Sequence, residues 1–86
     1  MSIMELVPHS GQKSFYGKAK VISENGIVKL LSYETIVCKY DRHTGEFTRT
    51  WGGYSDTTMR HVNEFLHTFG ISGGGKKWWL SLPVER

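Results

Sequence analysis

The sequence has little of what usually reinforces a short chain. Among its 86 residues it has one cysteine, Cys38, so no disulfide can form within the chain. One cysteine and four scattered histidines are also too few to predict a structural zinc site. A chain of this length buries only about 60–65% of the surface of its extended form, so its stability is small. We therefore expect its stability to come from dense side-chain packing or from a partner subunit.

Two further absences limit where in the cell the protein is expected. No stretch approaches the roughly 18–20 consecutive apolar residues of a membrane span. The first residues lack the basic region and the long apolar core of a secretory signal. A lone thiol at Cys38, within an alternating apolar run, is typical of the reducing cytosol. We therefore expect a cytoplasmic protein that does not associate with a membrane.

Aromatic residues are plentiful, whereas the charge is only mildly basic. Four phenylalanines, four tyrosines and three tryptophans make 13% of the chain, which favours a well-packed core. The net charge of +3 suits a polyanionic partner, but many ordinary soluble domains carry as much. Cations on the expected strands, with aromatic residues nearby, also suit a nucleic-acid platform. These residues are Lys18, Lys20, Lys29, Lys39, Arg49, Tyr16, Tyr40 and Trp51.

Alternating apolar and polar residues predict strands in the first two-thirds of the chain. The expected strands cover residues 13–23, 27–31, 35–40 and 46–51. Between the first two, Asn25-Gly26 gives the strongest short hairpin signal, because both residues tolerate a positive φ. Residues 32–34 break or bend the run, and residues 41–45 form a longer loop that ends in glycine. We therefore predict an antiparallel meander of three or four strands.

An amphipathic helix is predicted from Asp56 to Phe69. Ser55 is a suitable N-cap, and Gly70 can end the helix in the left-handed conformation. Apolar residues recur at helical spacing on one face, at Met59, Val62, Phe65, Leu66 and Phe69. A sheet with one apolar face needs such a cover, so we predict a small α+β fold with this one helix across the sheet.

A short helical turn is predicted at residues 76–82, ended before Pro83. Trp78 and Trp79 are neighbours in it and cannot both be buried easily, so we expect one of them at a partner interface. The expected domain plan is a flexible leader or short edge element at residues 1–12 and a single α+β domain at residues 13–86.

The run Gly73-Gly74-Gly75-Lys76-Lys77 invites comparison with phosphate-binding loops. The P-loop needs a strand before it and a Ser or Thr after its lysine, and this run has neither, so we expect no nucleotide hydrolysis. Glycine N–H groups and Lys76 could still bind an anion in a looser way. The alternative is a plain flexible connector, and the sequence leaves both open.

The polar side of the predicted helix holds the other candidate contacts. Arg60, Asn63 and His67 lie about one turn apart, which suits either a solvated face or a recognition surface. His61 and His67 are six residues apart, which is not the i, i+4 spacing of a metal chelate. Cys38 in an apolar strand indicates packing rather than a nucleophile. We therefore expect no metal, no cofactor and no enzymatic activity.

Three segments carry a recognisable pattern: residues 33–37, residues 49–65, and residues 77–84 with Trp78-Trp79 and Leu82-Pro83-Val84. The central block, Gly-Tyr-Ser-Asp-Thr-Thr-Met-Arg-His-Val-Asn-Glu-Phe, runs from Gly53 to Phe65. Over about residues 30–84 the chain resembles short, functionally unassigned proteins of bacteriophages, prophages and plasmids, which share a Gly-Tyr-Ser-x-Thr-Thr-Met-Arg-His-x-Asn-x-Phe block. The resemblance implies a mobile-element setting, in which small proteins commonly bind host machinery, including defence systems such as CRISPR effectors. No catalytic residue or cofactor follows from it.

We therefore predict a non-catalytic phage-type binding protein that engages a host protein or nucleoprotein, for example as an anti-CRISPR inhibitor. Within the block, Arg60, His61 and Asn63 have no expected role in the core. The predicted partner-binding residues are Arg60, His61, Asn63, His67, Lys76, Lys77, Trp78 and Trp79. The alternative is direct binding of nucleic acid or a nucleotide by the basic sheet and the Gly73–Lys77 loop, with Gly73, Gly74, Gly75 and Lys76 around the anion. A homodimer is left open.

Overall fold

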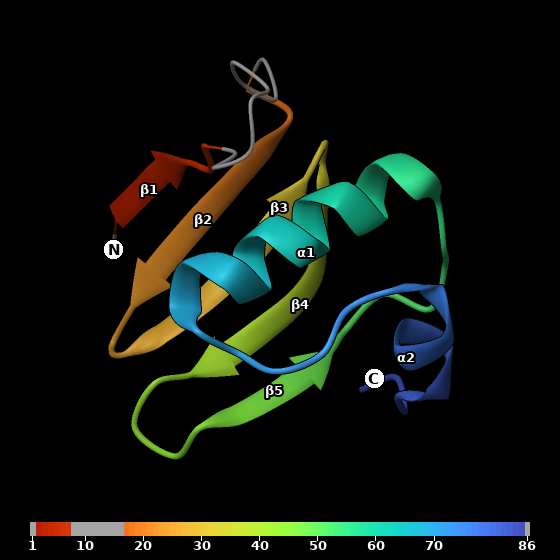
Figure 1. Cartoon of the computed structure of the whole chain (residues 1–86). Coiled ribbons are helices and arrows are strands. Elements are labelled where there is room, and N and C mark those ends of the chain that lie inside the picture. Colours follow the sequence, from red (N-terminus) through yellow and green to blue (C-terminus); the bar gives the residue numbers. More distant parts are fainter. Residues whose placement is uncertain (1, 8–16, 86) are drawn as a thin grey trace.

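The computed structural model describes residues 2–7 and 17–85. Five strands form one antiparallel sheet in the order β1-β2-β3-β4-β5, and two helices follow (Figure 1). The elements are β1 (Ser2–Glu5), β2 (Ala19–Glu24), β3 (Ile27–Ser32), β4 (Thr35–Asp41), β5 (Glu46–Arg49), α1 (Asp56–Phe69) and α2 (Lys76–Ser81). The predicted α+β class is confirmed, whereas the predicted count of three or four strands was too low.

The additional strand is β1, at one edge of the sheet. It pairs antiparallel with β2, with Ile3 opposite Ile22, and it lies in the segment expected as a flexible leader. A short edge element, the other reading of that segment, describes residues 2–5 better. The strand expected from residue 13 is seen from Ala19 as β2, and residues 13–16 lie outside the described residues.

Two tight turns reverse the chain between β2, β3 and β4. Asn25 (φ 52°) and Gly26 (φ 80°) connect β2 to β3 with the positive angles that the Asn-Gly signal predicts. The interruption at residues 32–34 is a second reversal, because Ser32 pairs with Thr35 around a two-residue turn. Tyr33 occupies that turn with a φ of 56°, which is uncommon for a bulky side chain. Of the two predictions for residues 32–34, a break or a bend, the structure confirms the break, which is the connection between β3 and β4.

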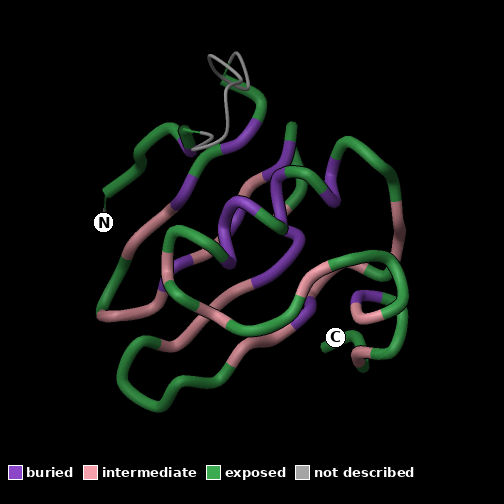
Figure 2. Tube along the Cα trace, viewed as in Figure 1, coloured by how far each residue is buried: buried purple, intermediate pink, exposed green. Residues whose placement is uncertain are grey.

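The long helix has the predicted bounds and both predicted caps. The Ser55 hydroxyl accepts a hydrogen bond from the backbone N–H of Thr58 at 3.1 Å, and Gly70 ends α1 with a φ of 66°. The helix crosses one face of the sheet (Figure 1), and buried segments of both layers meet there (Figure 2). The core contains Leu6, Ala19, Val21, Val28, Leu30, Val37, Cys38, Met59, Val62, Phe65, Leu66 and Trp79.

The end of the chain returns to the other edge of the sheet. After α2, Val84 forms a parallel bridge with Arg49, and the N–H of Glu85 donates to the carbonyl of Arg49 at 2.8 Å. The loop between the helices passes in front of β5, and α2 lies near the end of that strand (Figure 1). Both helices therefore lie on the same side of the sheet, and the opposite side carries no described helix.

Candidate binding surface

A buried arginine fixes the position of the C-terminal segment. Arg49 is only 4% exposed, and its guanidinium donates four hydrogen bonds to backbone carbonyls. The acceptors are the carbonyl oxygens of Trp51 (2.9 Å), Trp79 (2.9 Å), Leu82 (3.2 Å) and Gly53 (3.3 Å). These acceptors come from the segment between β5 and α1 and from α2 with the residue after it, so one side chain joins the two regions. We call this arrangement the Arg49 anchor.

The second member of the Trp pair belongs to the Arg49 anchor and not to a partner interface. Trp79 is 1% exposed, its Nε1 donates to the carbonyl of Gly53 at 2.9 Å, and the Arg49 guanidinium lies 4.7 Å from its ring centroid. Trp78 is half-buried, and its ring lies 5.3 Å from that of Phe47. The prediction that Trp79 contacts a partner was therefore wrong, because its ring fills the core and its N–H is satisfied there.

The glycine loop before α2 is packed against the protein rather than open as an anion cradle. A Cβ at Gly73 would collide with the indole of Trp78, and Gly74 lies against Asn63. The N–H of Gly75 donates to the side-chain oxygen of Asn63 at 3.3 Å. One of the N–H groups expected to bind an anion is thus already used, and Asn63 fastens this loop to α1.

The same loop places Lys76 of α2 close to the residues just before α1. The ammonium group of Lys76 lies 5.0 Å from the ring centroid of Tyr54, whose hydroxyl donates to Asp56 at the start of α1 at 2.9 Å. This hydrogen bond raises the pKa of Tyr54, because losing the proton would place two negative charges together. Arg60 is exposed and lies on α1 between Asp56, which binds the Tyr54 hydroxyl, and Asn63, which binds the glycine loop.

The outward side of α2 combines lysines with an exposed leucine. Lys76, Lys77, Leu80 and Ser81 line a shallow, largely apolar hollow of about 480 Å³. Leu80 is 51% exposed and is one of six large apolar residues at the surface of the described part of the chain. Sequence reasoning missed Leu80, yet a signal was present: a six-residue helix with three apolar residues in a row cannot bury all of them. We call Arg60, Asn63, Lys76, Lys77, Leu80 and Ser81 the α1–α2 face.

His61 is the second residue whose predicted role was wrong. It is 1% exposed, and its Nδ1 lies 2.8 Å from the hydroxyl of Ser32, which in turn lies 3.3 Å from the hydroxyl of Thr58. Burial, together with the nearby ammonium group of Lys18, lowers the pKa of His61 below its ordinary value. The side chain is therefore a neutral core residue that joins α1 to the end of β3. His67, by contrast, is exposed.

A serine and a histidine within hydrogen-bond distance also occur in nucleophilic enzymes. Here Ser32 is 2% exposed and His61 is 1% exposed, so a substrate has no access to either without rearrangement of α1. Cys38 is fully buried, and burial raises the pKa of its thiol, which keeps it protonated and unreactive. In residues 2–7 and 17–85 no group of three or more His, Cys, Asp or Glu side chains is placed to hold a metal ion. No helix there is long and apolar enough to cross a membrane.

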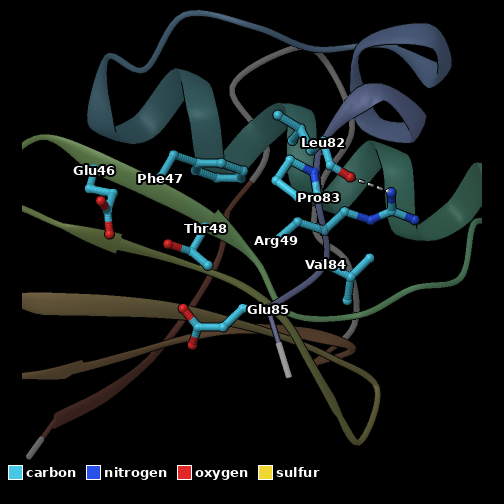
Figure 3. A pocket seen from close by; sticks show the side chains of 8 residues that line it. All are labelled: Glu46, Phe47, Thr48, Arg49, Leu82, Pro83, Val84 and Glu85. Atoms are coloured by element: carbon cyan, nitrogen blue, oxygen red, sulfur yellow. Dashed lines mark hydrogen bonds between the residues drawn. The ribbon is translucent and has the colours of Figure 1, made fainter.

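A groove separates β5 from the returning chain end. Its volume is about 330 Å³, and Figure 3 shows Phe47 and Thr48 on one wall and Pro83 and Val84 on the other. The Arg49 guanidinium spans its floor to the carbonyl of Leu82 (Figure 3). The lining mixes charged, polar and apolar groups. The groove therefore lies along the contact between the chain end and the sheet, and the side chain of Arg49 is part of its lining.

The cations of the sheet do not form one basic platform. Arg49, expected on that platform, is buried under the helices instead. On the uncovered side, Lys20 lies opposite Glu5 in the β1–β2 register. The ammonium group of Lys39 lies 2.7 Å from a carboxylate oxygen of Glu85. Phosphate binding by these lysines would compete with carboxylates that are already close.

The aromatic residues expected beside those cations offer little to stack on. Tyr40 and Trp51 pack against the core, and Tyr16 lies outside the described residues. Tyr33, which sequence reasoning did not select, is 51% exposed, with the ammonium group of Lys18 at 5.8 Å from its ring centroid. One exposed ring beside one lysine is a small target for a nucleic acid, which usually engages several stacked bases.

The sequence profile of a protein family of unknown function, DUF8033, matches residues 4–81. The chain belongs to this family. The matched segment runs from within β1 to the end of α2, and it includes every residue of the α1–α2 face and all of the Arg49 anchor except Leu82. No curated protein and no solved structure matches the chain. Membership of this family is consistent with the expectation of a functionally unassigned protein, and it assigns no activity to the residues described above.

Proposed function

We propose that this member of DUF8033 is a non-catalytic protein that binds another protein through its α1–α2 face. The observation that carries the proposal is the Arg49 anchor, which holds α2 so that Lys76, Lys77 and Leu80 stand exposed around an apolar hollow. A six-residue helix is not stable in water by itself, so the anchor is what fixes these side chains in place. Binding through a surface that is already ordered costs less conformational entropy.

The chemistry of the α1–α2 face indicates the kind of partner. An exposed leucine between lysines suits a protein surface on which an apolar residue is flanked by carboxylates. The face carries the cations Arg60, Lys76 and Lys77, and Asp56 lies one helical turn from Arg60 at the start of α1. A nucleic acid would make little use of the apolar hollow, and the neighbouring glycine loop is occupied by Asn63 and Trp78. A protein with an acidic and apolar patch is therefore the better match.

The proposal includes a setting, a host cell invaded by a mobile element. It is supported by the resemblance of residues 30–84 to phage, prophage and plasmid proteins of unassigned function. In that setting the partner is a cytoplasmic host protein or nucleoprotein, and a component of a defence system such as a CRISPR effector is a natural class of target. The α1–α2 face would then act by occupying a functional surface of that target.

The proposal is tested by affinity capture from host cells with the wild-type chain, two variants of the α1–α2 face and one control variant. Leu80→Asp and Lys77→Glu alter the α1–α2 face, and Lys20→Glu makes the same charge change on the sheet as a matched control. We expect a stoichiometric host protein with the wild type and with Lys20→Glu, resistant to nuclease, and its loss with the other two variants. The partner is then purified and titrated with each variant.

Other results would overturn the proposal. Capture that is equally strong with Leu80→Asp and Lys77→Glu places the interface elsewhere. Recovery of nuclease-sensitive nucleic acid, with an affinity that falls steeply as salt rises, favours the nucleic-acid alternative. Interaction with a protein through Leu80 should depend only modestly on ionic strength, because its apolar part is not screened.

A further inference from the structure

The uncovered face of the sheet has an ordered distribution of charge. In the antiparallel register its side chains form three rows across the strands. The middle row, which we call the lysine row, is Ile3, Ile22, Lys29, Lys39 and Thr48. The row beside it, the acidic row, is Glu24, Ile27, Asp41 and Glu46. The third row is Glu5, Lys20, Leu31 and Ile36.

The lysine row is unfavourable within one molecule. Lys29 and Lys39 lie directly opposite each other on adjacent strands, and like charges in that position repel. Lys39 pairs with Glu85, whereas Lys29 has no carboxylate at ion-pair distance within residues 2–7 and 17–85. Aliphatic side chains separate these charges and remain partly exposed, with Ile22, Ile27 and Leu31 half-buried. Facing lysines among partly exposed aliphatic side chains are unfavourable in a surface that contacts only water.

We propose that a second copy of this chain packs against the uncovered face, with a two-fold axis that runs along the rows between the lysine row and the acidic row. That axis places the lysine row of each copy against the acidic row of the other. Each Lys29 then approaches Glu24 and Asp41 of the second copy, while Ile22 and Ile27 of both copies meet around the axis. The third rows lie outside this contact.

The geometry of such a pair is that of two stacked sheets. Sheets pack face to face about 10 Å apart, with strand directions that differ by about 30°. Five strands of up to seven residues give a face of roughly 20 Å by 20 Å, which is at the small end for a stable interface. We therefore expect a reversible dimer with a dissociation constant on the order of 10–100 µM.

A second copy fits this face better than an unrelated protein, because the face itself carries the opposite charge that each row needs. The lysine row is complementary in charge to the acidic row beside it, and a second copy presents both rows. An anionic partner would be attracted by Lys29 but repelled by Glu24, Asp41 and Glu46. The inference does not rest on the proposed function. The α1–α2 face lies on the helix side of the sheet and stays accessible when the uncovered face is occupied (Figure 1).

Sedimentation velocity of the full chain over a range of concentrations tests the dimer. We expect Lys29→Glu and Glu24→Lys each to raise the dissociation constant at least about tenfold, because each places like charges together. An equimolar mixture of the two variants should dimerise again, since each supplies the charge that the other lacks. Only contact between molecules gives this rescue. Asp41 is left unchanged because its carboxylate also accepts hydrogen bonds from the backbone N–H groups of His43 and Thr44.

Lys77→Glu is the matched control, because it changes the net charge as Lys29→Glu does but lies on α2. It should dimerise like the wild type, and circular dichroism should show that all variants are folded. A wild type that stays monomeric at every concentration overturns the inference. A dimer that both charge variants leave intact also overturns it, and indicates another contact such as the exposed edge strand β1. Failure of the mixture to dimerise contradicts the proposed pairing of rows.

Discussion

The two faces of the sheet use polar side chains in opposite ways. Under the helices, Arg49, His61 and Ser32 are buried, and each is hydrogen-bonded within the protein. On the uncovered face, Lys29 and Glu24 keep their charges at the surface, among aliphatic residues that are only half-buried. A buried polar group is costly unless it is paired, so the covered face must specify its partners closely. The uncovered face has no such constraint, which leaves its charges available for contact with another molecule.

The largest effect should follow from removing the Arg49 anchor. Arg49→Met keeps much of the side-chain volume but removes the guanidinium donor from four backbone carbonyls. The carbonyls of Gly53 and Trp79 keep a second donor, from the Trp79 indole and from the N–H of Leu82, whereas those of Trp51 and Leu82 lose the donor described for them. We expect the free energy of unfolding to fall by about 3–5 kcal/mol, because buried unpaired acceptors and a lost cation–π contact add together. Urea denaturation followed by tryptophan fluorescence measures this change.

Two further substitutions serve as comparisons for Arg49→Met. Arg49→Lys should fall between wild type and Arg49→Met, since one ammonium group cannot reach acceptors spread over two segments. Lys29→Met, on the uncovered face, should change the free energy of unfolding by less than about 0.5 kcal/mol. If Arg49→Met lost less than Lys29→Met, the anchor would not hold the C-terminal segment.

The next largest effect is expected at His61, which joins α1 to β3. His61→Ala removes a buried ring and leaves the Ser32 hydroxyl with a weaker partner, so we expect a loss of about 2–3 kcal/mol at neutral pH. His67→Ala, on the exposed side of the same helix, is the control and should cost less than about 0.5 kcal/mol. Thermal unfolding of the two variants distinguishes the two positions.

The same residue gives the protein a pH dependence of known sign. The pKa of His61 in the folded chain lies below its ordinary value of 6.5, so the folded state binds its proton less readily than the unfolded state. Its contribution to stability is therefore complete above pH 6.5 and is lost as the pH falls through the folded pKa. In His61→Gln, which keeps a polar side chain, this part of the acid destabilisation should disappear. An unchanged pH profile in His61→Gln would show that other groups cause the wild-type dependence.

Local signals predicted the elements of the covered face well. The Asn25-Gly26 turn, the Ser55 cap and the Gly70 cap follow from backbone preferences that single residues carry. Tertiary features were harder to see. Tyr33 adopts a positive φ that its side chain does not favour, so the sequence did not decide whether residues 32–34 break or bend the strand. β1 has only four residues, and its pairing depends on β2.

The roles of the site residues were also hard to predict from the sequence, because they depend on contacts between distant residues. The burial of His61 depends on Ser32, which is 29 residues away, and the role of Arg49 depends on carbonyls that α2 supplies. The alternation along β5 did indicate that Arg49 points inward, because Arg49 is two residues from Phe47 and residues two apart in a strand lie on the same face. Lys76 and Lys77 of α2, which the sequence suggested as partner-binding residues, are exposed, and their role stays a prediction. Leu80 was overlooked because Trp78 and Trp79 were the more conspicuous apolar residues.

A smaller effect is expected where the glycine loop meets Trp78. A methyl group at Gly73 would collide with the indole, and the φ of 131° there is one that other residues rarely adopt. We expect Gly73→Ala to cost about 1–2 kcal/mol and to loosen α2, which near-ultraviolet circular dichroism of the tryptophans would report. Gly52→Ala is the control, because ordinary van der Waals space surrounds that position. Equal effects of the two substitutions would contradict tight packing of this loop.

The smallest effect on the monomer is expected on the uncovered face, and two neighbouring residues provide the comparison. Leu31 is half-buried on the uncovered face, and Leu30 is fully buried beneath α1. At low concentration Leu31→Ala should cost less than about 1 kcal/mol, whereas Leu30→Ala should cost about 2–5 kcal/mol. Urea denaturation at one low protein concentration measures both. Equal losses would mean that the uncovered face around Leu31 is packed within the monomer, which would contradict the contrast between the two faces.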